Sequence, residues 1–161
     1  MSEINPKFVK YNLIDHGFLL NLLGIGDSTN SIVKELLVDN AADLVDKGSL
    51  TEMVAGLELL KYMSPNERHD LYYWQNLTRG TVSEVDYVLS RGIDIVPMEV
   101  KSGLRGSMAS LYVFMEKEHI KYAIRCSLEN FGEFVSPKGK KILVNPLYAI
   151  SNLFSCGERL L

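Results

Sequence analysis

The sequence predicts an α/β (α+β) domain in which a mixed sheet is flanked by helices, and three observations lead to that prediction. The 161 residues are 47% hydrophobic and 23% charged, which is the composition of an ordinary globular domain. Segments with the apolar spacing of helices are interleaved with short segments rich in β-branched and aromatic residues. Turn residues separate most of these segments. A chain of this length buries roughly two-thirds of its unfolded surface, so one compact domain is expected.

The first 46 residues predict a helical N-terminal extension, packed on a core that occupies residues 47–161. A short strand is expected over residues 8–11, followed by helices over residues 14–23 and 31–45. The sequence has no internal repeats and no long linkers. The extension and the core are therefore expected to belong to a single domain.

The core begins with a predicted helix over residues 49–63, which Pro65 ends. Its apolar stripe is expected to be buried and consists of Leu50, Met53, Val54, Leu57 and Leu60. Glu52 lies off that stripe, on a face that it shares with Ala55, Gly56 and Leu59. Small residues on this face would let the helix approach a sheet closely, and the Glu52 carboxylate could then reach the end of that sheet.

Three strands are expected after this helix, over residues 71–74, 85–89 and 93–100. The segment Ser90-Arg91-Gly92 has the turn chemistry of an antiparallel hairpin. The second and third of these strands should therefore pair with each other. Tyr and Trp residues in the first strand are expected to pack in or near the core, although aromatic rings can also stack on nucleic-acid bases.

The remaining elements predict a second helix followed by further strands. A loop over residues 103–106 leads into a helix that starts at Ser107. Strands are expected over residues 122–126 and 142–144, and a short final helix over residues 146–153. The order of elements in the core is therefore helix, three strands, helix and strands.

The antiparallel hairpin carries the most informative polar residues in the chain. Glu99 and Lys101 alternate with Val100, so they point to the same face of a strand, about 7 Å apart. Folding the hairpin is expected to bring Asp86 beside Glu99. Two carboxylates and an ammonium group at the end of a sheet predict a site for a hard divalent cation and an activated water. In isolation a Glu-x-Lys tripeptide is more commonly a solvated strand face.

The loop before the second helix predicts a contact with an anion. Arg105 and Gly106 precede a helix N-terminus, where free N–H groups and the helix dipole favour negative charge. Together with Ser107 they are therefore candidates for binding a phosphate. The alternative is that Ser107 acts only as the helix cap, which is the commoner role of a serine at this place.

A set of short segments, taken in chain order, resembles a known group of proteins. The segments are Asp15-His16-Gly17-Phe18-Leu19, Gly48-Ser49-Leu50-Thr51-Glu52, Tyr72-Tyr73-Trp74, Glu84-Val85-Asp86, Pro97-Met98-Glu99-Val100-Lys101-Ser102-Gly103, Gly106-Ser107 with Ser110-Leu111, and Asn145-Pro146-Leu147-Tyr148. With a Glu on the first core helix, an Asp on the second strand and Glu-x-Lys on the third, the chain resembles the PD-(D/E)XK nuclease superfamily. It is most similar to the uncharacterised C-terminal domain that follows a P-loop (AAA+-like) ATPase module in bacterial and archaeal proteins.

The resemblance implies a restriction-endonuclease-like core with the order αβββαβ. It also implies Mg²⁺-dependent (or Mn²⁺-dependent) hydrolysis of DNA, with Glu52, Asp86, Glu99 and Lys101 as catalytic residues. The metal ligands would be Asp86 and Glu99, the Val100 carbonyl, and Glu52 either directly or through water. The ATPase module is absent, so the chain is expected to be the C-terminal part of a longer ATPase or a stand-alone relative. The alternative function is a catalytically inactive module that binds nucleic acid or a partner protein and regulates such an ATPase.

Charge and cysteine content limit the other classes of function. The net charge of −3 argues against a strong general affinity for nucleic acid, although residues 97–161 carry 9 Lys/Arg against 6 Asp/Glu. Cys126 and Cys156 are isolated and are expected to be reduced core thiols, and the three His residues are scattered. No apolar run has the length of a membrane span, and no signal peptide is recognisable at the N-terminus. A cytoplasmic location is therefore expected.

Overall fold

The structure is a computed structural model, and the part of the chain that it describes lies mostly in the predicted core. The described residues are 7–15, 17, 18, 21, 47–63, 66, 70–78, 81–104, 106–117 and 119–153. The chain divides into two compact units, residues 1–44 and 45–161. The helices predicted over residues 14–23 and 31–45 fall largely outside the described residues. Residues 8–11 form no strand, so that prediction is wrong.

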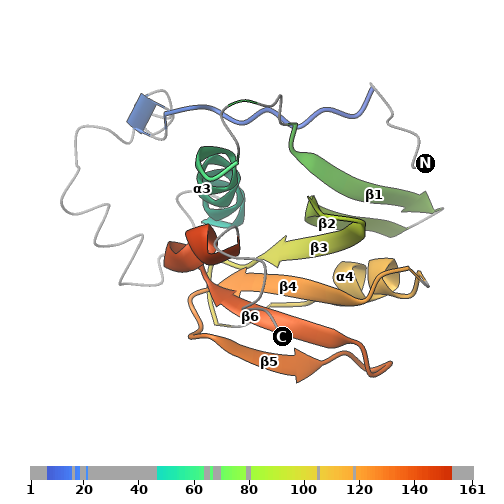
Figure 1. The fold of residues 1–161 in the computed structure, drawn as a ribbon. Coiled ribbons are helices and arrows are strands. Elements are labelled where there is room, and N and C mark those ends of the chain that lie inside the picture. The colour runs from blue at the N-terminus through green and yellow to red at the C-terminus, as the bar shows by residue number, and fades with distance from the viewer. Residues whose placement is uncertain are drawn as a thin grey trace. The chain divides into compact units, whose positions relative to one another are not determined.

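The second unit contains a six-stranded mixed sheet with the order β1-β2-β3-β4-β6-β5 (Figure 1). The strands are β1 (Tyr72–Thr78), β2 (Thr81–Arg91), β3 (Asp94–Val100), β4 (Tyr122–Ser127), β5 (Gly132–Val135) and β6 (Lys141–Pro146). β1, β2 and β3 form an antiparallel meander, whereas β3, β4 and β6 run parallel and β5 is antiparallel to β6. The expected mixed sheet is confirmed.

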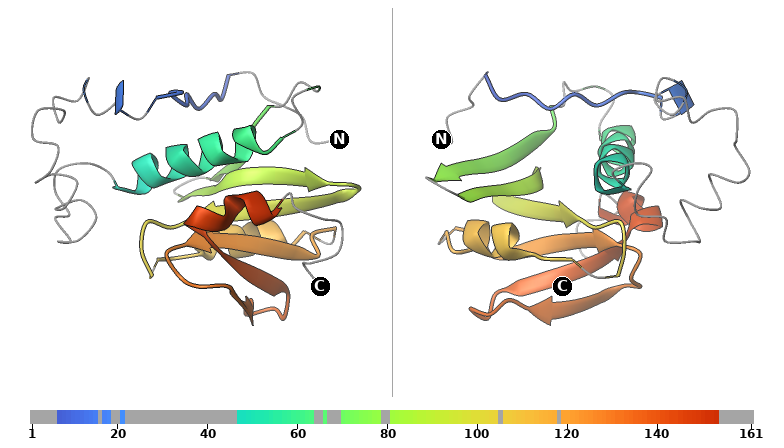
Figure 2. Two further views of the ribbon diagram at one scale, coloured as in Figure 1. Left: turned by 60° about the vertical axis from the view of Figure 1, so that its left-hand side comes forward. Right: turned by 180° about the vertical axis from the view of Figure 1, so that it is seen from behind.

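Helices cover both faces of this sheet (Figure 2). The helix α3 (Lys47–Lys61) and the 3₁₀ helix η2 (Leu147–Leu153) lie on one face, and α4 (Ala109–Met115) lies on the other. Each face has its own core cluster. The cluster under α3 and η2 contains Leu59, Met98 and Ile150, and the cluster under α4 contains Leu111, Phe114 and Ile142. Alternate residues of the central strands therefore enter opposite cores.

The buried face of α3 differs from the predicted apolar stripe. Ala55 and Leu59 are completely buried, whereas Val54 and Leu60 are exposed. The stripe prediction weighed hydrophobicity alone, but the helix approaches the sheet through small residues because they let the two backbones come close. Glu52 was expected to share the face of α3 that carries Ala55 and Leu59. Because this face packs on the sheet, the Glu52 side chain lies near the sheet.

The predicted β2–β3 hairpin is confirmed, but its turn lies later than Ser90-Arg91-Gly92, because Ser90 and Arg91 still belong to β2. Arg91 pairs with Asp94, so the turn consists of Gly92 and Ile93. Gly92 has φ +59°, a left-handed conformation that glycine adopts without strain. This tight turn fixes the register of the two strands and therefore which residues of β2 lie near the end of β3.

No helix in the described part of the chain has the length and apolar character to cross a bilayer.

Candidate metal centre

A bulge in β2 determines where the acidic residues point. Tyr72 pairs with Val88 and Trp74 pairs with Val85, so two steps along β1 correspond to three along β2. In this bulge Asp86 and Tyr87 of β2 together lie opposite the single residue Tyr73 of β1. Val85 is buried in the cluster under α4, while Tyr87 is buried in the cluster under α3. Bulges of this kind redirect side chains, and they are frequent beside functional sites.

The α3 helix is tied to this bulge by a hydrogen bond. The hydroxyl of Tyr87 donates to the main-chain carbonyl of Glu52, with the two oxygens 2.7 Å apart. Because Tyr87 is adjacent to Asp86, the contact brings the first half of α3 next to the bulge. This contact helps to hold Glu52 beside the sheet, which is where the sequence predicted it.

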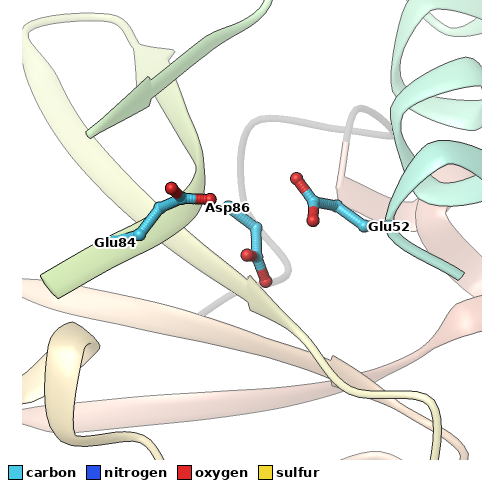
Figure 3. A group of neighbouring side chains, drawn as sticks. All are labelled: Glu52, Glu84 and Asp86. Atoms are coloured by element: carbon cyan, nitrogen blue, oxygen red, sulfur yellow. The ribbon is translucent and has the colours of Figure 1, made fainter. Parts of the chain in front are cut away.

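Three carboxylates lie together at this position: Glu52 from α3, and Glu84 and Asp86 from β2 (Figure 3). One oxygen of each lies within 4.8 Å of the others. In Figure 3 the Asp86 side chain lies between Glu84 and Glu52, and all three residues are half-buried. Like charges at this separation repel each other, so a bound cation would stabilise the group.

Two further contacts orient this acidic group. The main-chain N–H of Val100 donates a hydrogen bond to Asp86 Oδ2 at 2.7 Å, where the β2–β3 ladder has ended. The side chain of Asp86 thus accepts from a strand N–H that lies beyond the end of the β2–β3 ladder. Gln75, which pairs with Glu84 across β1 and β2, donates from Nε2 to Glu84 Oε2 at 3.3 Å. Both β2 carboxylates are therefore held by neighbouring strands.

Glu99 and Lys101 do not belong to this acidic group. Met98 and Val100 lie in the cluster under α3, so strand alternation directs Glu99 to the face covered by α4. Glu99 is only 5% exposed, and its Oε1 lies 2.6 Å from Lys101 Nζ. The structure thus brings Glu52 and Asp86 together with Glu84, and it places Glu99 with Lys101. Among the described residues, the acidic group that could hold a cation does not include Glu99.

The predicted phosphate loop also lies on the α4 face of the sheet. Arg105 falls outside the described residues. Gly106 has φ +157°, and a Cβ at this position would lie 2.7 Å from Lys101 Cδ. Ser107 Oγ accepts a hydrogen bond from the N–H of Ala109 at 3.3 Å, although α4 itself begins one residue after Met108. Ser107 therefore supports the first turn of α4 from outside the helix.

Buried polar residues on β4 were missed by the sequence analysis. Arg125 is 7% exposed and pairs in register with Glu99 across β3 and β4. Its Nε lies 2.9 Å from Glu129 Oε2. An arginine within an apolar strand pattern is the sequence signal for this role.

Cys126 is a buried free thiol on the α3 face of β4, as expected, whereas Cys156 lies outside the described residues. Burial raises the pKa of the Cys126 thiol to about 12, an increase that a hydrogen bond with Asn145 partly opposes. A thiol with this pKa is protonated at neutral pH and is a poor nucleophile and a poor metal ligand. Its role is in the packing of the core.

Comparison with known proteins gives one match. A family model described as "Domain of unknown function (DUF4143)" matches residues 47–150, which is more than half of the chain. The matched segment begins with α3 and ends within η2, so it contains the whole sheet and the acidic group. No curated protein and no solved structure matches the chain.

Proposed function

We propose that this chain, which belongs to the DUF4143 family of domains of unknown function, binds a divalent cation and hydrolyses phosphodiester bonds in DNA. The observation that carries the proposal is the meeting of Glu52, Glu84 and Asp86 within 4.8 Å. These residues come from two elements that are far apart in sequence. The Tyr87 hydrogen bond and the β2 bulge are needed to bring them together.

The donor set fits Mg²⁺ or Mn²⁺. Carboxylate oxygens are the ligands that these hard ions prefer. Oxygens on opposite sides of Mg²⁺ lie about 4.2 Å apart, since each Mg–O bond is about 2.1 Å long. The three carboxylate oxygens all lie within 4.8 Å of one another, so small side-chain rotations could bring them onto one ion. An ion held by three carboxylates also keeps several coordination positions for water and for a phosphate oxygen.

The arrangement of elements supports the finer assignment to a PD-(D/E)XK-like core. α3 is followed by an antiparallel meander, the crossover helix α4 and a strand parallel to β3. Asp86 lies on the second strand, and Glu99-Val100-Lys101 spans the end of the third. These positions agree with the motif order on which the resemblance depends. They also place the acidic group near the carboxyl end of β3, where ligands of α/β sheets commonly bind.

In the proposed reaction the bound cation would lower the pKa of a coordinated water and neutralise charge on the phosphate. Glu52, Glu84 and Asp86 would hold it, and the hydrogen bond from Val100 would keep Asp86 in place. Lys101 would stabilise negative charge on the phosphate with its ammonium group. Because its Nζ is paired with Glu99, Lys101 must exchange that partner for the substrate.

The pairing of Glu99 with Lys101 supports a second candidate function. A motif lysine that is 2.6 Å from a buried glutamate is already neutralised by it. The alternative is a module without catalytic activity that binds a protein partner and regulates a P-loop ATPase. The net charge of −3 is consistent with a protein partner rather than with nucleic acid.

Calorimetric titration with Mg²⁺ and Mn²⁺, followed by incubation with linear, supercoiled and branched DNA, separates the two candidates. The first predicts cation binding and cleavage that Glu84→Gln and Asp86→Asn abolish. Glu116→Gln and Asp94→Asn are matched controls, since both remove a carboxylate from a surface ion pair. Absence of cation binding with all DNA forms left intact would refute hydrolysis and favour the regulatory module.

A further inference from the structure

Arg125 is a buried arginine that the proposed chemistry does not use. It is 7% exposed, whereas arginine is rarely buried to this extent unless its guanidinium group is paired. Two of its three nitrogens donate hydrogen bonds, whereas Nε lies beside a carboxylate without the geometry of a hydrogen bond. Nε lies 2.9 Å from Glu129 Oε2, Nη1 donates to Met108 Sδ at 3.3 Å, and Nη2 donates to the Leu104 carbonyl at 2.8 Å.

Two of these contacts hold the connection between β3 and α4. Leu104 lies inside that connection, and Met108 lies at its end, directly before α4. At its start, the Lys101 N–H donates to the Cys126 carbonyl of β4 at 2.8 Å. The connection is thus attached to β4 at its start, middle and end, and Arg125 supplies two of the three attachments.

The β3–α4 connection also packs against the side chain of Lys101. The Cα of Gly106 lies so close to the Lys101 side chain that a Cβ there would be 2.7 Å from Cδ and 3.2 Å from Cε. On its other side the Lys101 ammonium group meets Glu99, at 2.6 Å. The aliphatic part of Lys101 is therefore enclosed between a strand and a loop, and its side chain is only 23% exposed.

We propose that Arg125 is a positioning residue that holds the β3–α4 connection against Lys101 and thereby directs the Lys101 ammonium group to Glu99. A role of the Lys101 position in hydrolysis rests on the proposed function. The position of Lys101 itself does not depend on that function. A guanidinium fork can reach Leu104, Met108 and Glu129 at once, whereas an ammonium group of the same charge cannot replace it. Gly106 also contributes to the position of Lys101, because a Cβ at residue 106 would overlap the Lys101 side chain.

Competitive acetylation of lysines with acetic anhydride, followed by mass spectrometry, tests this proposal without a metal or DNA. Lys138, with a side chain that is 67% exposed, is an internal reference. Lys140 reports on general opening, because its Nζ donates to the carbonyls of Met115 and Lys117. In the unmodified chain Lys101 should react more slowly than Lys138.

Arg125→Gln should raise the acetylation rate of Lys101 about fivefold relative to Lys138, with Lys140 unchanged. Arg125→Lys should give a similar increase, because it keeps the charge but loses the fork. Gly106→Ala should do the same from the other side of the loop, and it decides the question if the Arg125 variants do not fold. Lys121→Gln removes a surface ion pair with Asp94 and is the control.

An unchanged Lys101 rate in folded Arg125→Gln and Gly106→Ala proteins would overturn the proposal, as would full rescue by Arg125→Lys. Parallel increases at Lys101 and Lys140 would also overturn it, since they would mean general loosening. Absence of cation binding or of DNA cleavage would refute the proposed function, but it would not affect the proposal for Arg125. The two proposals can therefore fail separately.

Discussion

The hydroxyl of Tyr87 donates a hydrogen bond to the main-chain carbonyl of Glu52 and so joins the β2 bulge to the α3 helix. The oxygen–oxygen distance is 2.7 Å, and Tyr87 is only 4% exposed. Asp86 precedes Tyr87 directly, so the contact aligns the two segments that contribute the acidic group. A residue that binds no ligand thus controls the spacing of residues that are proposed to do so.

Tyr87→Phe should lower the free energy of unfolding by about 1 kcal/mol, because a partly buried hydrogen bond is lost. The variant should also bind Mn²⁺ more weakly, since α3 is no longer held against the bulge. Chemical denaturation and calorimetric titration measure the two effects. Tyr148→Phe is the control, because Tyr148 is 82% exposed. Cation affinity equal to that of the unmodified chain would show that the hydrogen bond does not set the site.

Ala55→Leu should destabilise the domain by about 1–3 kcal/mol, because Ala55 is completely buried between α3 and the sheet. The larger side chain should push α3 outward and increase the distance from Glu52 to Asp86, weakening cation binding. Ala109→Leu makes the same change on the exposed side of α4 and should have little effect. Thermal unfolding and cation titration of both variants measure the difference. Equal stability of the two variants would contradict the close approach of α3.

Cys126 should not react with a thiol reagent in the native state at pH 7–8, because its pKa is raised to about 12. The test uses a Cys156→Ala background, so that only Cys126 contributes to the signal. Labelling should require unfolding, and its rate should therefore follow the concentration of denaturant. Rapid labelling of the folded protein would contradict the burial of this thiol.

The same thiol predicts a dependence of stability on pH. Its folded pKa of about 12 lies above its ordinary value of 9.0, so the contribution to stability is complete below pH 9. The contribution is lost as pH rises toward 12, by up to about 1.4 kcal/mol for each pH unit. Denaturation of the unmodified chain and of Cys126→Ala between pH 8 and pH 11 measures the difference. Parallel curves for the two proteins would falsify this assignment.

The sequence was sufficient to predict the main elements of the core. Apolar periodicity located α3, β3, α4, β4, β6 and η2 to within a few residues, and Gly92 indicated the hairpin, whereas β2 was predicted over residues 85–89 and extends over Thr81–Arg91. β5 was missed because Gly132–Val135 is a four-residue edge strand whose residues are mostly exposed. A strand with so few buried side chains has no alternating pattern to detect. β1 was predicted too short because it continues through the polar pair Gln75-Asn76.

The membership of the acidic group could be predicted only in part. Glu52 and Asp86 were both expected at the site, but the sequence analysis paired Asp86 with Glu99 through simple hairpin register. The β2–β3 ladder keeps its register but ends at Tyr87 and Met98, before it reaches Asp86, and the acidic group contains Glu84 and not Glu99. A one-residue bulge leaves no clear mark in the pattern of apolar and polar residues. The role of Arg125 was missed for a similar reason, because its burial depends on contacts with a loop distant in sequence.

A crystal structure of the protein soaked in Mn²⁺, with the ion located by its anomalous scattering, tests directly whether the acidic group binds a cation. If these carboxylates hold the cation, one peak should lie between Glu52, Glu84 and Asp86, and it should disappear in Asp86→Asn. A peak beside Glu99 on the α4 face, or no peak near any of these carboxylates at a saturating concentration of Mn²⁺, would contradict cation binding by this group.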